Sequence, residues 1–214
     1  PDEPVQRLGW WLLIQLLALL LPVQSAVAQP SVVGQWSPAE PWPSVAIHTH
    51  LLPTGKVMFF SAEGDDSRLW DPATNTFSSA GLAGFNIFCA GHSFLADGRL
   101  LVTGGNVASL TGLPYAAIYD PFANSWTRLP DMNAPRWYPT NTTLSNGDVL
   151  VMAGTIDGQQ GANKLPQVWE VANNAWRDLT TAQISLDLYP WMFLLPDGRL
   201  VNSGPFRTTR ARDP

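Results

Sequence analysis

The sequence has little charge of either sign and almost no cysteine. Only 14% of its 214 residues are charged, against about a quarter in a typical soluble domain. Its net charge of -5 excludes the basic face that nucleic acids require. Cys89 is the single cysteine, which excludes an intrachain disulfide. Hydrophobic residues make up 45% of the chain, which excludes intrinsic disorder.

A long apolar run lies near the start of the chain. Residues 9–23 are almost wholly apolar, Arg7 precedes them, and Ala26-Val27-Ala28 follows. A basic residue, a short apolar stretch and a small-x-small sequence predict a secretory signal peptide over residues 1–28, cleaved after Ala28. An N-terminal membrane anchor is the alternative, although the run is shorter than the roughly 20 residues that a bilayer span needs. We therefore expect a secreted protein, extracellular or periplasmic, with no membrane span in the mature chain.

The sequence beyond this segment repeats itself. A turn centred on Gly98 has counterparts with the same flanks at Gly55, Gly147 and Gly198, at intervals of roughly fifty residues. Asp-Gly and Asn-Gly between apolar segments predict tight hairpin turns, because glycine accepts a positive φ. A second element, an aromatic residue followed by a turn and another aromatic residue, recurs in step with the first. Each unit should therefore hold four short strands, which in the second unit are His92–Leu95, Arg99–Thr103, Tyr115–Tyr119 and Ser125–Leu129.

Four-stranded units of this period, with a late aromatic residue that is tryptophan in the second and third units, indicate an all-β fold, a kelch-type β-propeller. We expect a linker over residues 29–45 and then about three and a half blades within residues 46–214. The expected blades cover residues 46–81, 89–130 and 138–180, with a partial blade over 189–214. Because a propeller removes its edge strands only when the ring is complete, an incomplete one predicts that this chain is part of a longer protein. A β-sandwich with coincidental turns is the alternative.

The register of the repeat brings the cysteine towards a tyrosine. Counting back by the same number of residues from each turn glycine reaches Ala46, Cys89, Tyr138 and Tyr189. In a propeller these positions begin the innermost strands of successive blades, and those strands converge on the axis. We therefore expect Cys89 to lie beside Tyr138. A thioether between the two would make the phenol easier to oxidise, whereas the alternative is that Cys89 is a small buried hydrophobe.

Two segments resemble a known family. Residues 88–93 (Phe-Cys-Ala-Gly-His-Ser) and 134–140 (Ala-Pro-Arg-Trp-Tyr-Pro-Thr) are similar to segments of the galactose oxidase and glyoxal oxidase family of copper radical oxidases, most closely its glyoxal-oxidase-like branch. The resemblance covers the chain from about Val45 to Pro214. It implies that Cys89 and Tyr138 form the thioether cofactor of that family. It also implies that Tyr138 is a copper ligand and the site of the radical.

The resemblance further implies a reaction. In that family, copper(II) and the tyrosyl radical together oxidise small aldehydes or primary alcohols, and dioxygen is reduced to hydrogen peroxide. The axial tyrosine and the two histidine ligands of the family have no counterpart in this chain, so residues 29–214 are expected to be inactive alone. Pro190 stands where galactose oxidase has a substrate-binding arginine, which disfavours galactose as the substrate. Ile156 stands where galactose oxidase stacks a tryptophan over its thioether.

Other residues remain open at this point. Trp137, Tyr189 and His92 are candidates for the substrate site, and His92 could instead bond a turn carbonyl. His48 and His50 share one strand face and are either a metal pair or ordinary strand residues. The alternative to an oxidase is a kelch propeller that binds a glycan or a protein without chemistry, because a fold does not fix a function. The sequence leaves the oligomeric state open.

Overall fold

The computed structural model describes residues 34–62, 64, 66–204 and 206–212. The expected signal peptide and its cleavage after Ala28 lie outside these residues. The chain divides into two compact units, residues 1–41 and 42–214. The second unit begins slightly before the expected blade boundary at residue 46, because Trp42 is already packed in it: its ring lies 4.7 Å from Phe59 and 5.1 Å from Trp70, centroid to centroid.

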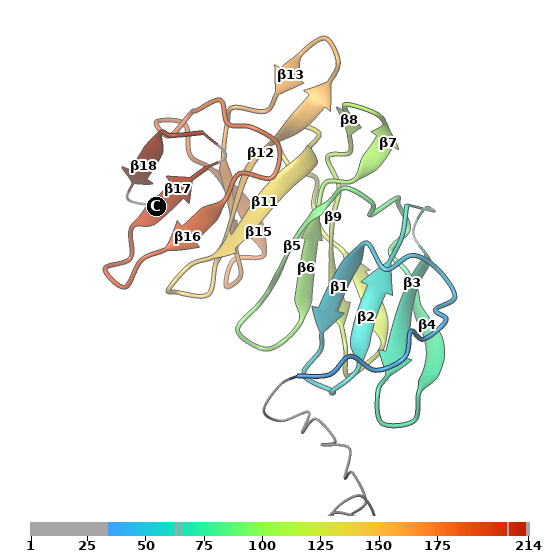
Figure 1. The fold of residues 1–214 in the computed structure, drawn as a ribbon. Coiled ribbons are helices and arrows are strands. Elements are labelled where there is room, and N and C mark those ends of the chain that lie inside the picture. The colour runs from blue at the N-terminus through green and yellow to red at the C-terminus, as the bar shows by residue number, and fades with distance from the viewer. Residues whose placement is uncertain (1–33, 63, 65, 205, 213–214) are drawn as a thin grey trace, which may run out of the picture. The chain divides into compact units, whose positions relative to one another are not determined.

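The second unit is all-β and contains four antiparallel sheets that follow one another along the chain (Figure 1). The first sheet consists, in spatial order, of β1 (His48–Leu51), β2 (Val57–Phe60), β3 (Asp66–Asp71) and β4 (Thr76–Leu82). The second consists of β5 (Gly91–Phe94), β6 (Leu100–Thr103), β9 (Ala116–Asp120) and β10 (Ser125–Arg128). No helix among the described residues has the length and apolar character needed to span a membrane.

The third sheet consists of β11 (Trp137–Thr143), β12 (Val149–Asp157), β14 (Gln167–Glu170) and β15 (Ala175–Asp178), with β13 (Gly161–Ala162) paired to β12. The fourth consists of β16 (Met192–Leu194), β17 (Leu200–Ser203) and β18 (Thr209–Arg212). The strands of the second sheet lie within a residue or so of the expected ranges. The sequence did not predict the small hairpin of β7 (Asn106–Ala108) and β8 (Thr111–Gly112).

The repeated glycines form the turns between the first two strands of each sheet. All four have a positive φ, between 82° and 89°: Gly55, Gly98, Gly147 and Gly198. In each turn the glycine N–H donates a hydrogen bond to the carbonyl of the leucine three residues earlier, as Gly98 does to Leu95 at 3.0 Å. The expected hairpin is therefore present at all four glycines, three times with Asp-Gly or Asn-Gly and once with Thr54-Gly55, and it fixes the register of each sheet.

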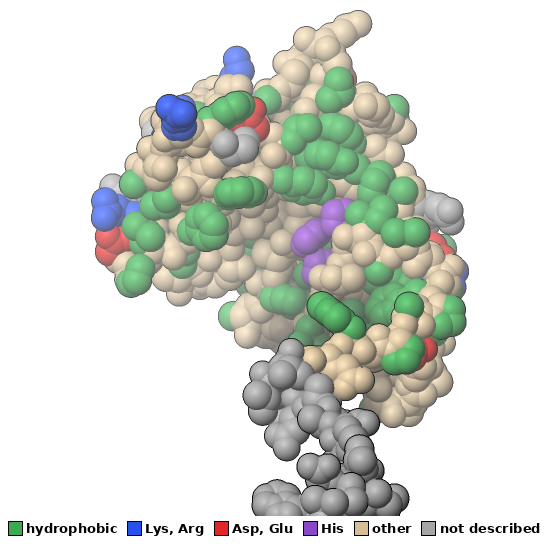
Figure 2. Space-filling model, in the orientation of Figure 1, with side chains coloured by type: hydrophobic (Ala, Val, Ile, Leu, Met, Phe, Trp, Pro, Cys, Tyr) green, Lys and Arg blue, Asp and Glu red, His purple; other side chains and the backbone are tan. Residues whose placement is uncertain are grey.

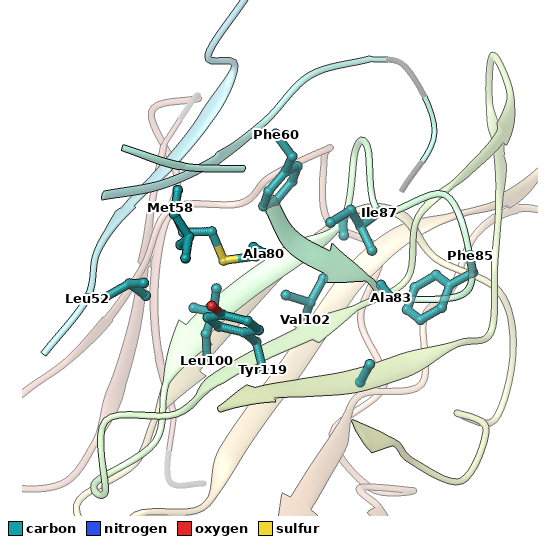
Figure 3. Packing of buried hydrophobic residues seen from close by; sticks show 13 residues of the cluster. Leu52, Met58, Phe60, Ala80, Ala83, Phe85, Ile87, Leu100, Val102 and Tyr119 are labelled. Carbon is teal, nitrogen blue, oxygen red and sulfur yellow. The ribbon is translucent and has the colours of Figure 1, made fainter. Parts of the chain in front are cut away.

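Neighbouring sheets pack through apolar side chains. Between the first and second sheets lies a core in which Met58 and Phe60 from β2 meet Leu100 and Val102 from β6 (Figure 3). The repeated tryptophans join the sheets by hydrogen bonds as well as by packing. The indole of Trp126 donates to the carbonyl of Ala80 at 3.0 Å, and its counterpart in the next sheet bonds in the same way.

The first strands of the second, third and fourth sheets lie next to one another (Figure 1). Side chains of β11 form hydrogen bonds to the sheets on both sides. Thr143 Oγ1 donates to the carbonyl of Phe94 in β5, and Thr140 Oγ1 donates to the carbonyl of Pro190, just before β16. Both bonds are 2.8 Å long. This contact brings together the residues that precede or begin the three strands.

Candidate functional site

Three residues that the register makes equivalent share an unusual backbone conformation. Cys89, Tyr138 and Tyr189 have φ values of 63°, 63° and 46°. Residues other than glycine rarely adopt a positive φ, since the side chain then crowds the backbone. Such strain persists only where the surrounding structure imposes it, and it is concentrated at functional sites.

Backbone hydrogen bonds tie these three positions into a chain across three sheets. The N–H of Tyr138 donates to the carbonyl of Cys89 at 2.9 Å, and the N–H of Tyr189 donates to the carbonyl of Tyr138 at 2.8 Å. The N–H groups of Tyr138 and Tyr189 thus each bond to the equivalent residue of the preceding sheet. The phenol of Tyr189 reaches one sheet further and donates to the carbonyl of Ala90 at 3.0 Å.

The side chains of Cys89 and Tyr138 are close enough for each to shift the pKa of the other, and their backbones are joined by the hydrogen bond from the Tyr138 N–H to the Cys89 carbonyl. Cys89 is a free cysteine that is only 1% exposed. Burial raises the pKa of its thiol, and the pKa of Tyr138 is raised to about 12 by the Cys89 sulfur, which favours the protonated phenol as a hydrogen-bond donor, and by burial. Both groups are therefore protonated at neutral pH, and the structure places them together as the register predicts.

Two aromatic rings stack on Tyr138. The indole of Trp137 lies 3.9 Å from the phenol ring at an interplanar angle of 7°, and the ring of Tyr189 lies at 4.5 Å and 15°. One face of a phenol ring accommodates one ring at these separations, so the two neighbours lie on opposite faces. Asn106 Oδ1, on β7, accepts a hydrogen bond from the Trp137 indole at 2.9 Å. The rings stacked on the candidate radical site are thus those of Trp137 and Tyr189, while Ile156 lies in β12.

Arg136, two residues before Tyr138, is fully buried. Its guanidinium donates to the carbonyls of Ala153 and Leu165, each at 2.7 Å. Three glycines leave room for its backbone and side chain, since a Cβ at any of them would collide with Arg136: Gly104, Gly112 and Gly154. The sequence contains these glycines but does not show what they contact, so it did not reveal the role of Arg136.

His92 lies in a different contact from the one expected. Its Nε2 is 3.1 Å from Nδ1 of His48, and its ring centroid is 4.3 Å from that of His50. The three histidines form one patch in a hollow of the face shown in Figure 2. Burial and the neighbouring rings lower the pKa of His50 to about 4 and that of His92 to about 3, so the patch is uncharged at neutral pH.

The histidine patch borders the stacked rings, because His48 lies 6.5 Å from Tyr189 between ring centroids. Within the described ranges, no three His, Cys, Asp or Glu side chains are grouped so as to hold a metal ion. Within these ranges the structure thus does not support a metal site formed by His48 and His50. The phenol oxygen of Tyr138, beside the buried thiol, is the candidate donor for a metal at this site.

Comparison with known proteins identifies the family of the site. Residues 65–203 match the family model described as the glyoxal oxidase N-terminus. A galactose oxidase of Gibberella zeae is 28% identical over 203 aligned residues, which cover 83% of this chain and 29% of that protein. An aldehyde oxidase of Vitis pseudoreticulata, named GLOX, is 29% identical over 124 residues, covering 53% of this chain and 22% of that protein.

The fold is also similar to that of a solved enzyme. A fungal alcohol oxidase of the AA5 family, in complex with copper, superposes with a TM-score of 0.72 at 24% sequence identity. The match covers 85% of this chain and 42% of that one. The chain thus spans less than a third of the two curated relatives and less than half of the solved structure. With the family model matched over most of its second unit, the chain belongs to the galactose oxidase and glyoxal oxidase family, within the part described as the glyoxal oxidase N-terminus.

Proposed function

We propose that the protein of which this chain is a part is a secreted copper radical oxidase, which oxidises small aldehydes or primary alcohols and reduces dioxygen to hydrogen peroxide. The observation that supports this most directly is the proximity of Cys89 and Tyr138, whose backbones are joined by a 2.9 Å hydrogen bond and whose side chains shift each other's pKa. The relatives named galactose oxidase and aldehyde oxidase, and the copper in the solved alcohol oxidase, support the same class of reaction.

The donor chemistry of the site suits copper in part. Copper(II) takes oxygen and nitrogen ligands, and a phenolate oxygen at Tyr138 would be one of them. The phenol would have to lose its proton on binding, since its pKa is raised to about 12. No cluster of further ligands occurs among the described residues, so we infer that the remaining ligands lie elsewhere in the protein. Copper bound there would supply one of the two oxidising equivalents that the reaction needs.

We propose that Cys89 and Tyr138 become covalently joined. The new bond links Sγ of Cys89 to a ring carbon of Tyr138 and removes the thiol hydrogen and one ring hydrogen. The two electrons pass to dioxygen, which takes up two protons and leaves as hydrogen peroxide. Because sulfur donates electron density to the ring, the linked phenol is easier to oxidise to a radical. That radical would remove a hydrogen atom from the substrate carbon.

The neighbouring side chains define how substrate reaches this ring. Trp137 and Tyr189 cover the faces of Tyr138, which leaves the ring edge and its oxygen for reaction. Pro190 follows Tyr189 and offers no charged group to a sugar hydroxyl. This favours a small aldehyde or alcohol over galactose.

We further propose that the four sheets are blades of a kelch-type β-propeller that other parts of the protein complete. The recurring four-stranded sheets and the convergence of β5, β11 and β16 support this arrangement. It also explains why residues 29–214 alone should produce no peroxide with added copper, since they hold one of the proposed ligands. Peroxide production by that fragment would show the ligand assignment to be wrong.

Peptide mass spectrometry of the full-length, copper-loaded protein tests the proposal. Tandem spectra should contain residues 89 and 138 in one linked peptide pair, lighter by two hydrogens than the sum of its parts, and Cys89→Ser should abolish the pair together with oxidase activity. An active, copper-loaded enzyme without the link would refute the proposed chemistry. A protein that binds neither copper nor oxidisable substrate would instead favour a propeller that binds a glycan or a protein.

A further inference from the structure

Tyr189, which precedes the fourth sheet, contacts Tyr138 and the residue that follows Cys89. Its N–H donates to the carbonyl of Tyr138 at 2.8 Å, and its ring stacks on the ring of Tyr138. Its phenol hydroxyl donates to the carbonyl of Ala90, the residue that follows Cys89. One side chain therefore spans from the segment before β16 to the segment before β5, across the start of β11.

These contacts affect the position of the Cys89 backbone and the orientation of the Tyr138 ring, and both decide whether the sulfur can reach the ring. The hydrogen bond to the Ala90 carbonyl holds the Ala90–Gly91 peptide, which lies one peptide beyond Cys89, and Cys89 itself has a φ of 63° that is strained for a residue with a side chain. The stack fixes the plane of the Tyr138 ring, and the plane decides which ring edge faces the sulfur. Trp137 covers the opposite face but is tied to Asn106 on a separate hairpin. Tyr189 thus couples the position of the cysteine to the orientation of the phenol.

We propose that Tyr189 is a positioning residue for formation of the Cys89–Tyr138 bond, a role that rests on the proposed oxidase function. It acts through its hydroxyl on the backbone at Ala90 and through its ring on Tyr138. This differs from the substrate contact expected from the sequence, because the hydroxyl is already engaged by Ala90. Holding two reacting groups in a productive geometry is a large source of rate in such reactions, and small displacements are costly.

The test compares Tyr189→Phe with Tyr189→Leu in the full-length protein. The first variant removes the hydroxyl and keeps the stacked ring, and the second removes both. The matched control is Tyr119→Phe, which deletes another buried tyrosine hydroxyl, bonded to Asn124 at 2.8 Å, in a different part of the second sheet. After copper and dioxygen are added to reduced protein, the linked peptide is followed over time by mass spectrometry and by the near-ultraviolet absorption of the sulfur-substituted phenol.

We expect Tyr189→Phe to form the link roughly ten-fold more slowly than the wild type, the loss that one hydrogen bond of ordinary strength implies. Tyr189→Leu should be slower still, and Tyr119→Phe should match the wild-type rate. Denaturant midpoints measured on the same proteins show whether a slower rate reflects general destabilisation. A wild-type rate in both Tyr189 variants overturns the proposal.

A second measurement separates this inference from the proposed function. In copper-free protein, alkylation of Cys89 by iodoacetamide is measured by peptide mass. Loss of the hydrogen bond from Tyr189 to Ala90 should speed alkylation of Cys89 several-fold in Tyr189→Phe and Tyr189→Leu relative to Tyr119→Phe. If the wild type never forms the link, the oxidase proposal fails, and the alkylation rates alone decide whether Tyr189 positions Cys89. Unchanged alkylation together with an absent link removes both proposals.

Discussion

The indole nitrogen of Trp126 donates a hydrogen bond to the carbonyl oxygen of Ala80, 3.0 Å away, across the junction between the first and second sheets. Trp176 makes the same bond to Pro130 at 2.8 Å across the next junction. The repeated tryptophan thus connects neighbouring sheets by a hydrogen bond in addition to its apolar packing.

The hydrogen bond from Trp126 to Ala80 predicts the effect of Trp126→Phe. The substitution keeps an aromatic ring in the core but leaves the Ala80 carbonyl without its donor. The free energy of unfolding of the full-length protein should fall by about 1–3 kcal/mol, the cost of an unmade hydrogen bond together with some loss of packing. Denaturant unfolding measures it. Trp36→Phe, at a side chain that is 95% exposed, is the control and should change little.

Gly154 permits the close approach of Arg136, and this predicts the result of adding a methyl group. Gly154 has a φ of 85°, and a Cβ there would lie 2.8 Å from the Cβ of Arg136. Gly154→Ala should therefore lower the free energy of unfolding by about 2–4 kcal/mol through strain and collision. Gly158→Ala, where a Cβ would meet nothing within 4 Å, should change it by less than about 0.5 kcal/mol. Equal stability of the two variants would contradict this role for Gly154.

Arg136 donates to the carbonyls of Ala153 and Leu165, and the Leu165 carbonyl also accepts a longer hydrogen bond, 3.2 Å, from Asn133 Nδ2. In Arg136→Met the chain keeps a side chain of similar length, but the carbonyls of Ala153 and Leu165 lose a charged donor. Because hydrogen bonds to a charged group are worth about 1.5–3 kcal/mol each, we expect a loss of about 2–4 kcal/mol even after the cost of burying the cation is removed. Thermal and denaturant unfolding measure the change.

The control for this prediction is Arg99→Met. Arg99 pairs with Asp97 at 2.7 Å, but both side chains are more than a third exposed, and such surface pairs contribute about 0–1 kcal/mol. If the two arginine variants lost the same free energy of unfolding, burial would not explain the contribution of Arg136 to stability.

The register of the sheets could be predicted from the sequence, but the conformation of the site could not. Turn glycines with the same flanks mark equivalent positions, and those positions placed Cys89 and Tyr138 together. Successive residues on a strand point to opposite faces, which argues against stacking of Trp137 on Tyr138. The positive φ of Tyr138 breaks this alternation, and it arises from bonds to other sheets that a strand pattern does not contain.

The histidine patch could likewise be predicted only in part from the sequence. The i, i+2 spacing of His48 and His50 was visible in the sequence, and it predicted a shared face. The third member, His92, comes from the neighbouring sheet, so its approach depends on how the sheets pack. Contacts between sheets at positions that the repeat does not make equivalent, such as that of His92 with His48, were therefore found from the structure alone.

The histidine patch predicts a loss of stability in acid. Burial lowers the pKa of His48, His50 and His92 below the ordinary value of about 6.5. The unfolded chain therefore binds protons near pH 6.5 while the folded chain does not, so stability is complete above that pH and falls as the pH drops towards 4. Each histidine contributes a slope that approaches about 1.4 kcal/mol per pH unit. Denaturant unfolding of the full-length protein between pH 8 and pH 5 measures this slope. His92→Gln should make it shallower by about one proton, and an unchanged slope would mean that His92 titrates normally in the folded protein.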